Sequence, residues 1–581
     1  MSTDTQFTPP RKKPNIFWWL AGILVVLVAT FVYQLFGPNA LIIISRETTF
    51  ITEPLALDGL PDYEKYLLEL SRRNVSPEEN AAVLILQASW PVNRSTPDSA
   101  AIAQELQIKS IPAPQKMLQD FSNDENQRQL ALLLGWCPDI DDATTASLDE
   151  QPIEDPEVWD NESNNNYLYS PNSSLVMDSL QQTTSRPWTT NQLPFLANWV
   201  DQNKQPLDLL VEASRRPKCY FPSPSLLNDQ HNILLEMDLP GLCAIRDAHL
   251  PLSIRAMRNL GEGNLNDAWQ DILALHRLAR LTAQGPALYD QFYAFVIEST
   301  ASDDTLALLS DARLTSDQAK QTQSDLKSLP RFDRVADAFD GGERAIFLDS
   351  MTRHRGAVAV DSHGYVCNFP WEEYLSINWN VACRKGNDYF DRLSAAARLP
   401  TYAARQQAFS SIYAENSLQV DPRPRVLSTA LVNPFARNEM AAAIVLSYFL
   451  DPLKTCVARQ DEANARLDLL RIAAALAIYR AEHGKYPIKL DELIPDPLST
   501  EPVDLYTESP FLYRRTDDGY LLYNFGENGL DESGSRSWIS LEGQDFEQLS
   551  ADDKDKIPDG ADDLSIRLPR PDFELPQARK K

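Results

Sequence analysis

The stretch from Ile16 to Phe36 constrains the fold of this chain more than any other part of it. It contains no charged residue, and about 20 apolar helical residues are enough to cross the hydrocarbon core of a bilayer, which is roughly 30 Å thick. Trp18, Trp19 and Tyr33 lie near its two ends, where amphipathic rings favour the headgroup layer. The sequence therefore predicts a membrane-spanning helix at 16–36.

The residues that flank this stretch predict its orientation and its retention. Arg11, Lys12 and Lys13 precede it, and the positive-inside bias then keeps residues 1–15 in the cytoplasm as a short tail. A cleaved signal peptide is the alternative, but it would have a shorter apolar part of about 7–15 residues and a small-residue cleavage site. Pro38 stands where a small residue is wanted. We therefore expect an uncleaved anchor, with nearly all of the following chain outside the cytoplasm.

The charge of the chain excludes one class of partner. The formal net charge is −28, although the N-terminal tail is basic. A field of this sign repels phosphate backbones at long range, so we expect no nucleic-acid partner. Glycine is also scarce, with 20 residues in 581, which fits helices better than a fold built on glycine-rich nucleotide-binding loops.

Apolar periodicity predicts that most of the chain is helical. The clearest block makes one apolar face at three- and four-residue steps, formed by Leu265, Ala268, Trp269, Ile272, Leu275 and Ala279. A long helical run leads from about Asn438 to Gly484, and 512–513, 520–525 and 564–568 have the composition of strands. The predicted fold class is mainly α: a membrane anchor, an irregular stack of antiparallel helices, and a small C-terminal α/β module of a helix plus an antiparallel sheet.

Composition divides the chain into segments. Residues 138–194 are rich in Asp, Glu, Asn, Ser, Thr and Pro, which predicts a polar linker or a long surface loop. This segment separates an N-terminal helical region at 41–137 from a helical domain at 195–435. The long helix and the α/β module occupy 436–568, and 569–581 form a C-terminal tail.

The aromatic-rich stretch 365–391 holds the candidate catalytic residues. On a helix there, Asn380, Arg384, Asn387 and Asp391 would lie along one face at steps of four, three and four. One interpretation is a polar site beneath an aromatic wall, with Asn380, Arg384 and Asp391 as the catalytic candidates of an envelope hydrolase. The other, which we favour, is a hydrogen-bonded network that orients packed helices. The sequence contains no nucleophile elbow, phosphate-binding loop, zinc-protease motif or Cys-x-x-Cys pair.

The region that ends the long helix resembles a known module. The helix closes with Gly484-Lys485-Tyr486-Pro487, and Leu490–Pro495 and Tyr520–Gly529 follow in the same order as in the major pseudopilins of type II secretion. This resemblance implies a helix packed on a small antiparallel sheet. No prepilin-peptidase site stands near Ile16, so we expect a reused C-terminal module and no assembly into a pseudopilus.

The resemblance also implies a candidate metal site. In pseudopilins, the loop after the glycine binds calcium through aspartates, and the matching residues here are Glu527, Asn528, Asp531 and Glu532. Asn528 stands where an aspartate would be the better ligand. Because calcium takes six to eight oxygens, these side chains could contribute only with help from others. Calcium is the one cofactor that the resemblance suggests.

Short stretches elsewhere resemble large, single-anchor, extracytoplasmic bacterial proteins of unassigned function. The matching stretches are Ile51–Leu55, Ser76–Val83, Leu260–Gly263, Asn378–Asn380 and Asp391–Leu393. This resemblance implies a bacterial inner membrane and carries no activity with it. We therefore expect a non-catalytic scaffold or interaction protein of the cell envelope, held in the membrane through Ile16–Phe36 and bound to an envelope protein partner. A hydrolase and a calcium-stabilised adhesive or sensor domain are the alternatives.

Overall fold

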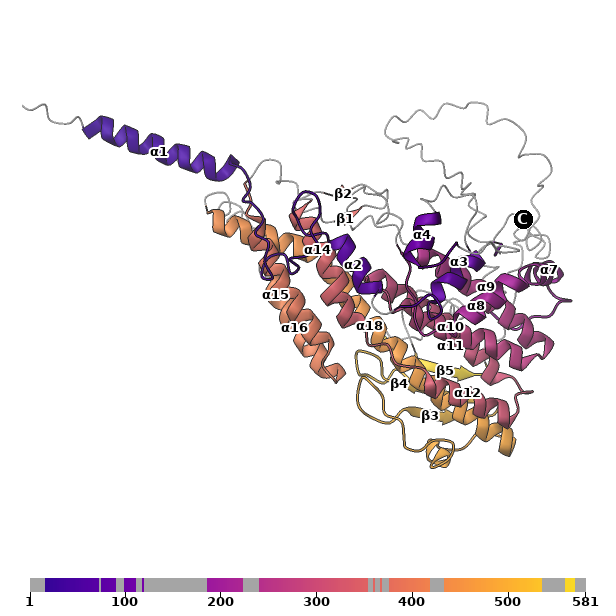
Figure 1. Ribbon diagram of the computed structural model, residues 1–581. Coiled ribbons are helices and arrows are strands. Elements are labelled where there is room, and N and C mark those ends of the chain that lie inside the picture. Colours follow the sequence, from indigo (N-terminus) through magenta and orange to yellow (C-terminus); the bar gives the residue numbers. More distant parts are fainter. Residues whose placement is uncertain are drawn as a thin grey trace, which may run out of the picture.

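The computed structural model describes residues 16–72, 75–89, 99–110, 118–119, 185–222, 240–353, 359–360, 366–367, 376–417, 433–535 and 560–569. These residues are mainly helical, with a small three-stranded antiparallel sheet near the C-terminus (Figure 1). The prediction of a mainly α chain with a small sheet is confirmed. The tail 1–15, residues 138–184 of the predicted linker, and residues 570–581 lie outside the described part of the chain.

The N-terminal helix α1 (Ile16–Phe36) extends away from the body of the molecule (Figure 1). Nearly all of its side chains are exposed. Among the described residues, Phe17–Phe36 is the one helix that is long and apolar enough to cross a membrane, and its place near the N-terminus suits either an anchor or a signal sequence.

Three short helices follow α1: α2 (Tyr63–Arg72), α3 (Ala81–Ser89) and α4 (Ser99–Glu105). The side chain of Asn80 fixes the start of α3. Its Oδ1 accepts hydrogen bonds from the backbone amides of Ala82 (3.1 Å) and Tyr220 (2.9 Å). One side chain thus satisfies an amide in the first turn of α3 and ties that helix to the segment after α8.

A stack of helices forms the centre of the body: α7 (Pro194–Gln202), α8 (Lys204–Ala213), α9 (Pro240–Glu262), α10 (Leu265–Thr282), α11 (Leu288–Ser310) and α12 (Ser316–Ser328). The apolar face predicted between Leu265 and Ala279 is buried, and α10 packs against both α9 and α11. Short connections make these consecutive helices antiparallel neighbours. Trp188 and Leu193 are also buried, so the described end of the predicted linker belongs to this packed body.

The next elements form a second group of helices. They are α13 (Val335–Ala338), a π-helical turn η3 (Phe339–Glu343), α14 (Arg344–Thr352), a ribbon of β1 (Ala359–Val360) and β2 (Val366–Cys367), α15 (Trp379–Ala397) and α16 (Tyr402–Ser417). The η3 turn brings Gly342 against the chain that leads into α11. A Cβ at Gly342 would lie 2.0 Å from the carbonyl oxygen of Pro286, so this approach requires glycine.

The longest helix, α18 (Pro434–His483), crosses the body from the α1 side to the sheet (Figure 1). The Asn433 side chain caps its start, and Gly484 ends it in the left-handed region at φ 73°. Its 50 residues correspond to about 75 Å of helix. Buried apolar residues of α18 between Ala441 and Ala463 belong to one hydrophobic core, and those between Ala465 and Ile478 belong to a second. Apolar packing therefore continues across the predicted boundary at 435/436.

The three-stranded sheet packs on the C-terminal half of α18. Its order is β3 (Leu512–Arg515), β4 (Tyr520–Asn524) and β5 (Leu564–Leu568), all antiparallel, after a short 3-10 turn η4 (Leu490–Leu493). Side chains alternate between buried and exposed along β5, as expected of a sheet with one covered face. The strands predicted at 512–513, 520–525 and 564–568 are therefore confirmed.

Candidate functional site

Asn380 lies at the start of α15 and binds the chain segment that follows α1. Its Oδ1 accepts the backbone amide of Ile43 (2.7 Å), and its Nδ2 donates to the carbonyl of Leu41 (2.8 Å) and to Asn378 Oδ1 (2.9 Å). Asn387, two turns further along, donates to the carbonyls of Glu47 and Thr48 (both 3.0 Å). These side-chain amides satisfy backbone groups of 41–48, a segment that belongs to no helix or strand.

Arg384 and Asp391 lie on the exposed side of the same helix. The Arg384 side chain is exposed, whereas Asp391 accepts a hydrogen bond from the buried guanidinium of Arg344 (2.6 Å). Arg344 also donates to Asp340 (2.6 Å). Asn380, Arg384 and Asp391 thus do not converge on one point. Of the aromatic residues predicted in 365–391, Trp379, Tyr389 and Phe390 are buried in the hydrophobic core. The others, Tyr365, Phe369, Trp371 and Tyr374, lie outside the described residues.

The four predicted calcium ligands lie in the loop after β4, and they have different roles. The side chains of Glu527 and Asp531 are exposed, and Asp531 Oδ1 accepts hydrogen bonds from Tyr523 and from the amide of Ser533. Asn528 braces the loop: its Oδ1 accepts the Leu530 amide (2.6 Å), and its Nδ2 donates to Glu532 Oε1 (2.8 Å). Of the four, Glu532 is the one that belongs to a group of three close carboxylates among the described residues.

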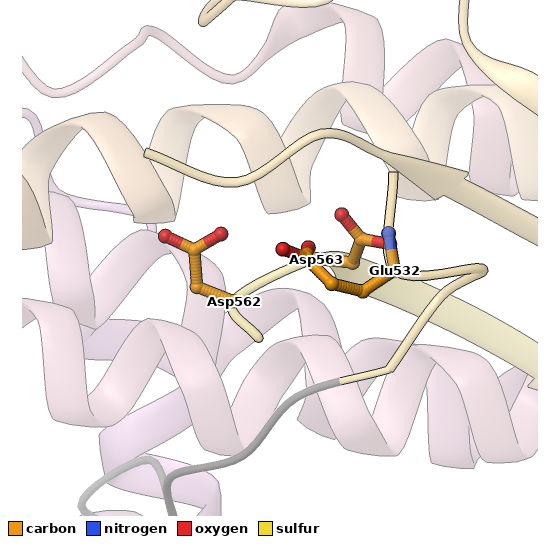
Figure 2. Close-up of side chains that lie close together, drawn as sticks. All are labelled: Glu532, Asp562 and Asp563. Atoms are coloured by element: carbon orange, nitrogen blue, oxygen red, sulfur yellow. The ribbon is translucent and has the colours of Figure 1, made fainter. Parts of the chain in front are cut away.

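The partners of Glu532 are Asp562 and Asp563, which directly precede β5. One carboxylate oxygen from each of the three lies within 4.8 Å of the others, and Figure 2 shows the three side chains gathered at this point. The pairing of β4 with β5 brings them together, because Asn524 and Leu564 are cross-strand partners. We call Glu532, Asp562 and Asp563 the acidic cluster.

Asp563 is the buried centre of the acidic cluster, with 1% of its surface exposed. Its Oδ2 accepts the backbone amides of Glu532 (3.0 Å) and Gly534 (2.8 Å). Its Oδ1 and the Oε2 of Glu532 are buried and accept no hydrogen bond from the part of the chain that is described. Burial, with the neighbouring Glu532 carboxylate, raises the pKa of Asp563 to about 7.

Buried carboxylate oxygens of this kind bind either a proton or a cation. Oxygens that coordinate calcium at 2.3–2.6 Å can lie at most about 5 Å apart, so the spacing of the acidic cluster fits one such ion. Three carboxylates also match the preference of calcium for hard oxygen ligands.

Asp562 and Asp563 were absent from the predicted ligand set. The sequence places them at the end of a strongly acidic stretch, about thirty residues after Glu532. The usable signal was the predicted strand 564–568: if it pairs antiparallel with 520–525, the residue before it must lie beside the loop after β4.

Comparison with known proteins adds no further assignment. No family model, curated protein or solved structure matches the chain.

Proposed function

We propose that this protein is a single-pass membrane protein of the bacterial cell envelope, with its N-terminus in the cytoplasm and its body outside, and that the body is a scaffold or interaction module. The observation that carries the proposal is the exposure of α1. A core helix of a soluble protein is mostly buried, whereas only 6% of the apolar window in α1 is covered by the body. Water is a poor solvent for such a surface.

The contacts at the end of α1 favour an anchor over a cleaved signal sequence. Arg437 of α18 donates a hydrogen bond to the carbonyl of Gln34 (2.6 Å), and the amide of Ser376 donates to the carbonyl of Leu35 (2.7 Å). Asn39 Oδ1 accepts the amide of Ile377 (2.8 Å). Residues 34–39, where a signal peptide would be cut, are therefore part of the folded body, and their last helical carbonyls are satisfied by it.

The scaffold role is supported by how α18 spans the body. Its first turn holds the end of α1 through Arg437, and its last turns carry the sheet. We propose that the part from the end of α18 through β5 is a pseudopilin-like module. A helix that ends at a left-handed Gly484 and packs on an antiparallel sheet of order β3-β4-β5 supports this. The module would present a surface to a protein partner at a distance from the anchor.

Cross-linking in cells tests the scaffold role. The full chain would be cross-linked in its native membrane, extracted in mild detergent and purified, and the products identified by mass spectrometry. A reproducible, stoichiometric envelope protein that is lost when Ile488 and other exposed residues of the module are replaced by charged ones supports the proposal. Purification of the chain alone, or with a glycan or peptide fragment, would contradict it and favour a hydrolase.

Calcium binding by the acidic cluster is a second candidate function, because two buried carboxylate oxygens face this point without a hydrogen-bond donor. The full chain in detergent should melt at a higher temperature in calcium than in chelator. Calcium at a hundred times its Kd would add about 2.7 kcal/mol. Equal melting in both conditions would rule out a calcium-stabilised adhesive or sensor domain.

The matched variants for this test are Asp563→Asn and Asp517→Asn. Asparagine at 563 keeps an oxygen for the amides of Glu532 and Gly534 and removes the charge beside Glu532, so the protein should fold and lose its response to calcium. Asp517 is exposed in the β3–β4 turn, and its variant should keep the full response.

A further inference from the structure

Four exposed apolar side chains lie close to the point where α1 meets the body: Leu41, Ile43, Ile44 and Phe435. Leu41 is 90% exposed and Phe435 is 68% exposed. Single exposed apolar residues are ordinary on protein surfaces, but these four gather around one feature. Three follow α1 directly in sequence, and the fourth comes from the first turn of α18.

Phe435 is held near the end of α1 by its own helix. It lies two residues before Arg437, whose guanidinium donates to the carbonyl of Gln34 in the last turn of α1. Arg437 also donates to the carbonyl of Ser376 (2.9 Å), and Ser376 in turn binds Leu35. The exposed ring of Phe435 is therefore fixed within about one helical turn of the residue that clasps the apolar helix.

Hydrogen bonds also fix the backbone of 41–43, so the exposed side chains of this segment are held in defined positions. Asn380 binds both the carbonyl of Leu41 and the amide of Ile43. Leu41 is four residues from Gly37, which limits the distance between them to about 14 Å even for a fully extended chain. Leu41 therefore lies close to the residue that follows the end of α1.

We propose that Leu41, Ile43, Ile44 and Phe435 form a membrane-resting patch that inserts into the headgroup-level layer of the bilayer around α1. The occupant is lipid because the patch is continuous with the proposed anchor and fixed to its end. The inference rests on the proposed function, since it requires α1 to span a membrane. The body then contacts the bilayer directly, and this contact restricts its rotation about α1. The restricted rotation in turn sets the direction in which α18 points.

Site-specific photo-cross-linking to lipid tests this patch in the full chain. Benzoylphenylalanine would be incorporated singly at Phe435, at Leu24 within α1, and at Ile488 as the matched control. Ile488 is 66% exposed and lies past the far end of α18, about 70 Å of helix from Phe435. Each protein would be reconstituted in vesicles of phosphatidylcholine and phosphatidylglycerol, irradiated, and searched for lipid adducts by mass spectrometry.

Lipid adducts at the three positions test the membrane-resting patch and the membrane anchor separately. We expect strong adducts at 24 and adducts at 435 that exceed those at 488 several-fold. Adducts at 24 with no excess at 435 over 488 would overturn the membrane-resting patch and leave the anchor intact. An absence of adducts at 24 would overturn the anchor itself, and the patch with it.

Discussion

Replacing Asn380 with alanine tests whether α15 carries a structural network or a catalytic site. The variant removes the partly buried hydrogen bonds to the backbone of Leu41 and Ile43, and each such bond contributes about 0.5–1.5 kcal/mol to stability. We therefore expect a loss of about 2 kcal/mol in the free energy of unfolding.

Alanine variants at two other positions of the same helix provide a comparison for this loss of stability. Arg384 is exposed, so Arg384→Ala should change stability by no more than about 0.5 kcal/mol. Asp391→Ala should cost about 1 kcal/mol, because the guanidinium of Arg344, which is 1% exposed, keeps Asp340 as a partner. The three variants should rank Asn380, Asp391, Arg384 in order of decreasing loss.

The measurement is thermal melting of the full chain in detergent, followed by circular dichroism, together with hydrogen exchange of residues 41–48. Only the Asn380 variant should lose protection at the Ile43 amide, because Asn380 is the acceptor of that amide. If the Asn380 variant melts like the wild type, or the Arg384 variant falls as far, the structural network is refuted. Loss of an enzymatic activity in all three at unchanged melting would favour a hydrolase.

Two further predictions concern the buried Glu343 of η3 and the glycine that ends α18. Burial raises the pKa of Glu343 from 4.5 to about 7, so the folded state binds the proton more tightly than the unfolded state and stability falls as pH rises through this range. Glu343→Gln keeps the acceptor for the Leu288 amide (3.0 Å) and should add up to about 3 kcal/mol above pH 7; parallel urea-unfolding midpoints for variant and wild type across pH would contradict this. Gly484→Ala should cost about 1 kcal/mol because φ is 73° there, and Lys485→Ala is the control; equal melting of the two variants would show that the left-handed cap is not needed.

The sequence could predict helices whose causes are local. The apolar face of α10 follows from spacing alone, and the end of α18 follows from a glycine that can adopt the left-handed conformation at the cap. The hairpin of β3 and β4 likewise joins neighbours in sequence across a short polar turn. In each case the residues that decide the structure lie within a few positions of one another.

The polar line on α15 shows where such local reasoning stops. At about 100° per residue, Asn380 and Asn387 fall at one edge of the predicted stripe, and Arg384 and Asp391 at the other. In the structure the first edge is buried and the second is exposed. The sequence defines the stripe, but which edge faces the segment 41–48 depends on packing between parts of the chain more than three hundred positions apart.

The acidic cluster could not be predicted from the sequence for the same reason. Glu532 was identified from its place in the loop, whereas Asp562 and Asp563 reach it only because β5 pairs with β4. The many acidic residues between them in the sequence gave no means of choosing these two. Long-range strand pairing, and not residue type, selects the members of the acidic cluster.

The topology of the full chain in cells is the most direct test of whether α1 anchors the body outside the cytoplasm. A chain with an epitope tag at Met1 would be expressed in a bacterium, and spheroplasts would be treated with protease from outside. We expect residues beyond 40 to be degraded while the tag and the anchor remain protected. A body that is protected until the membrane is lysed, or a tag that disappears together with the body, would contradict it.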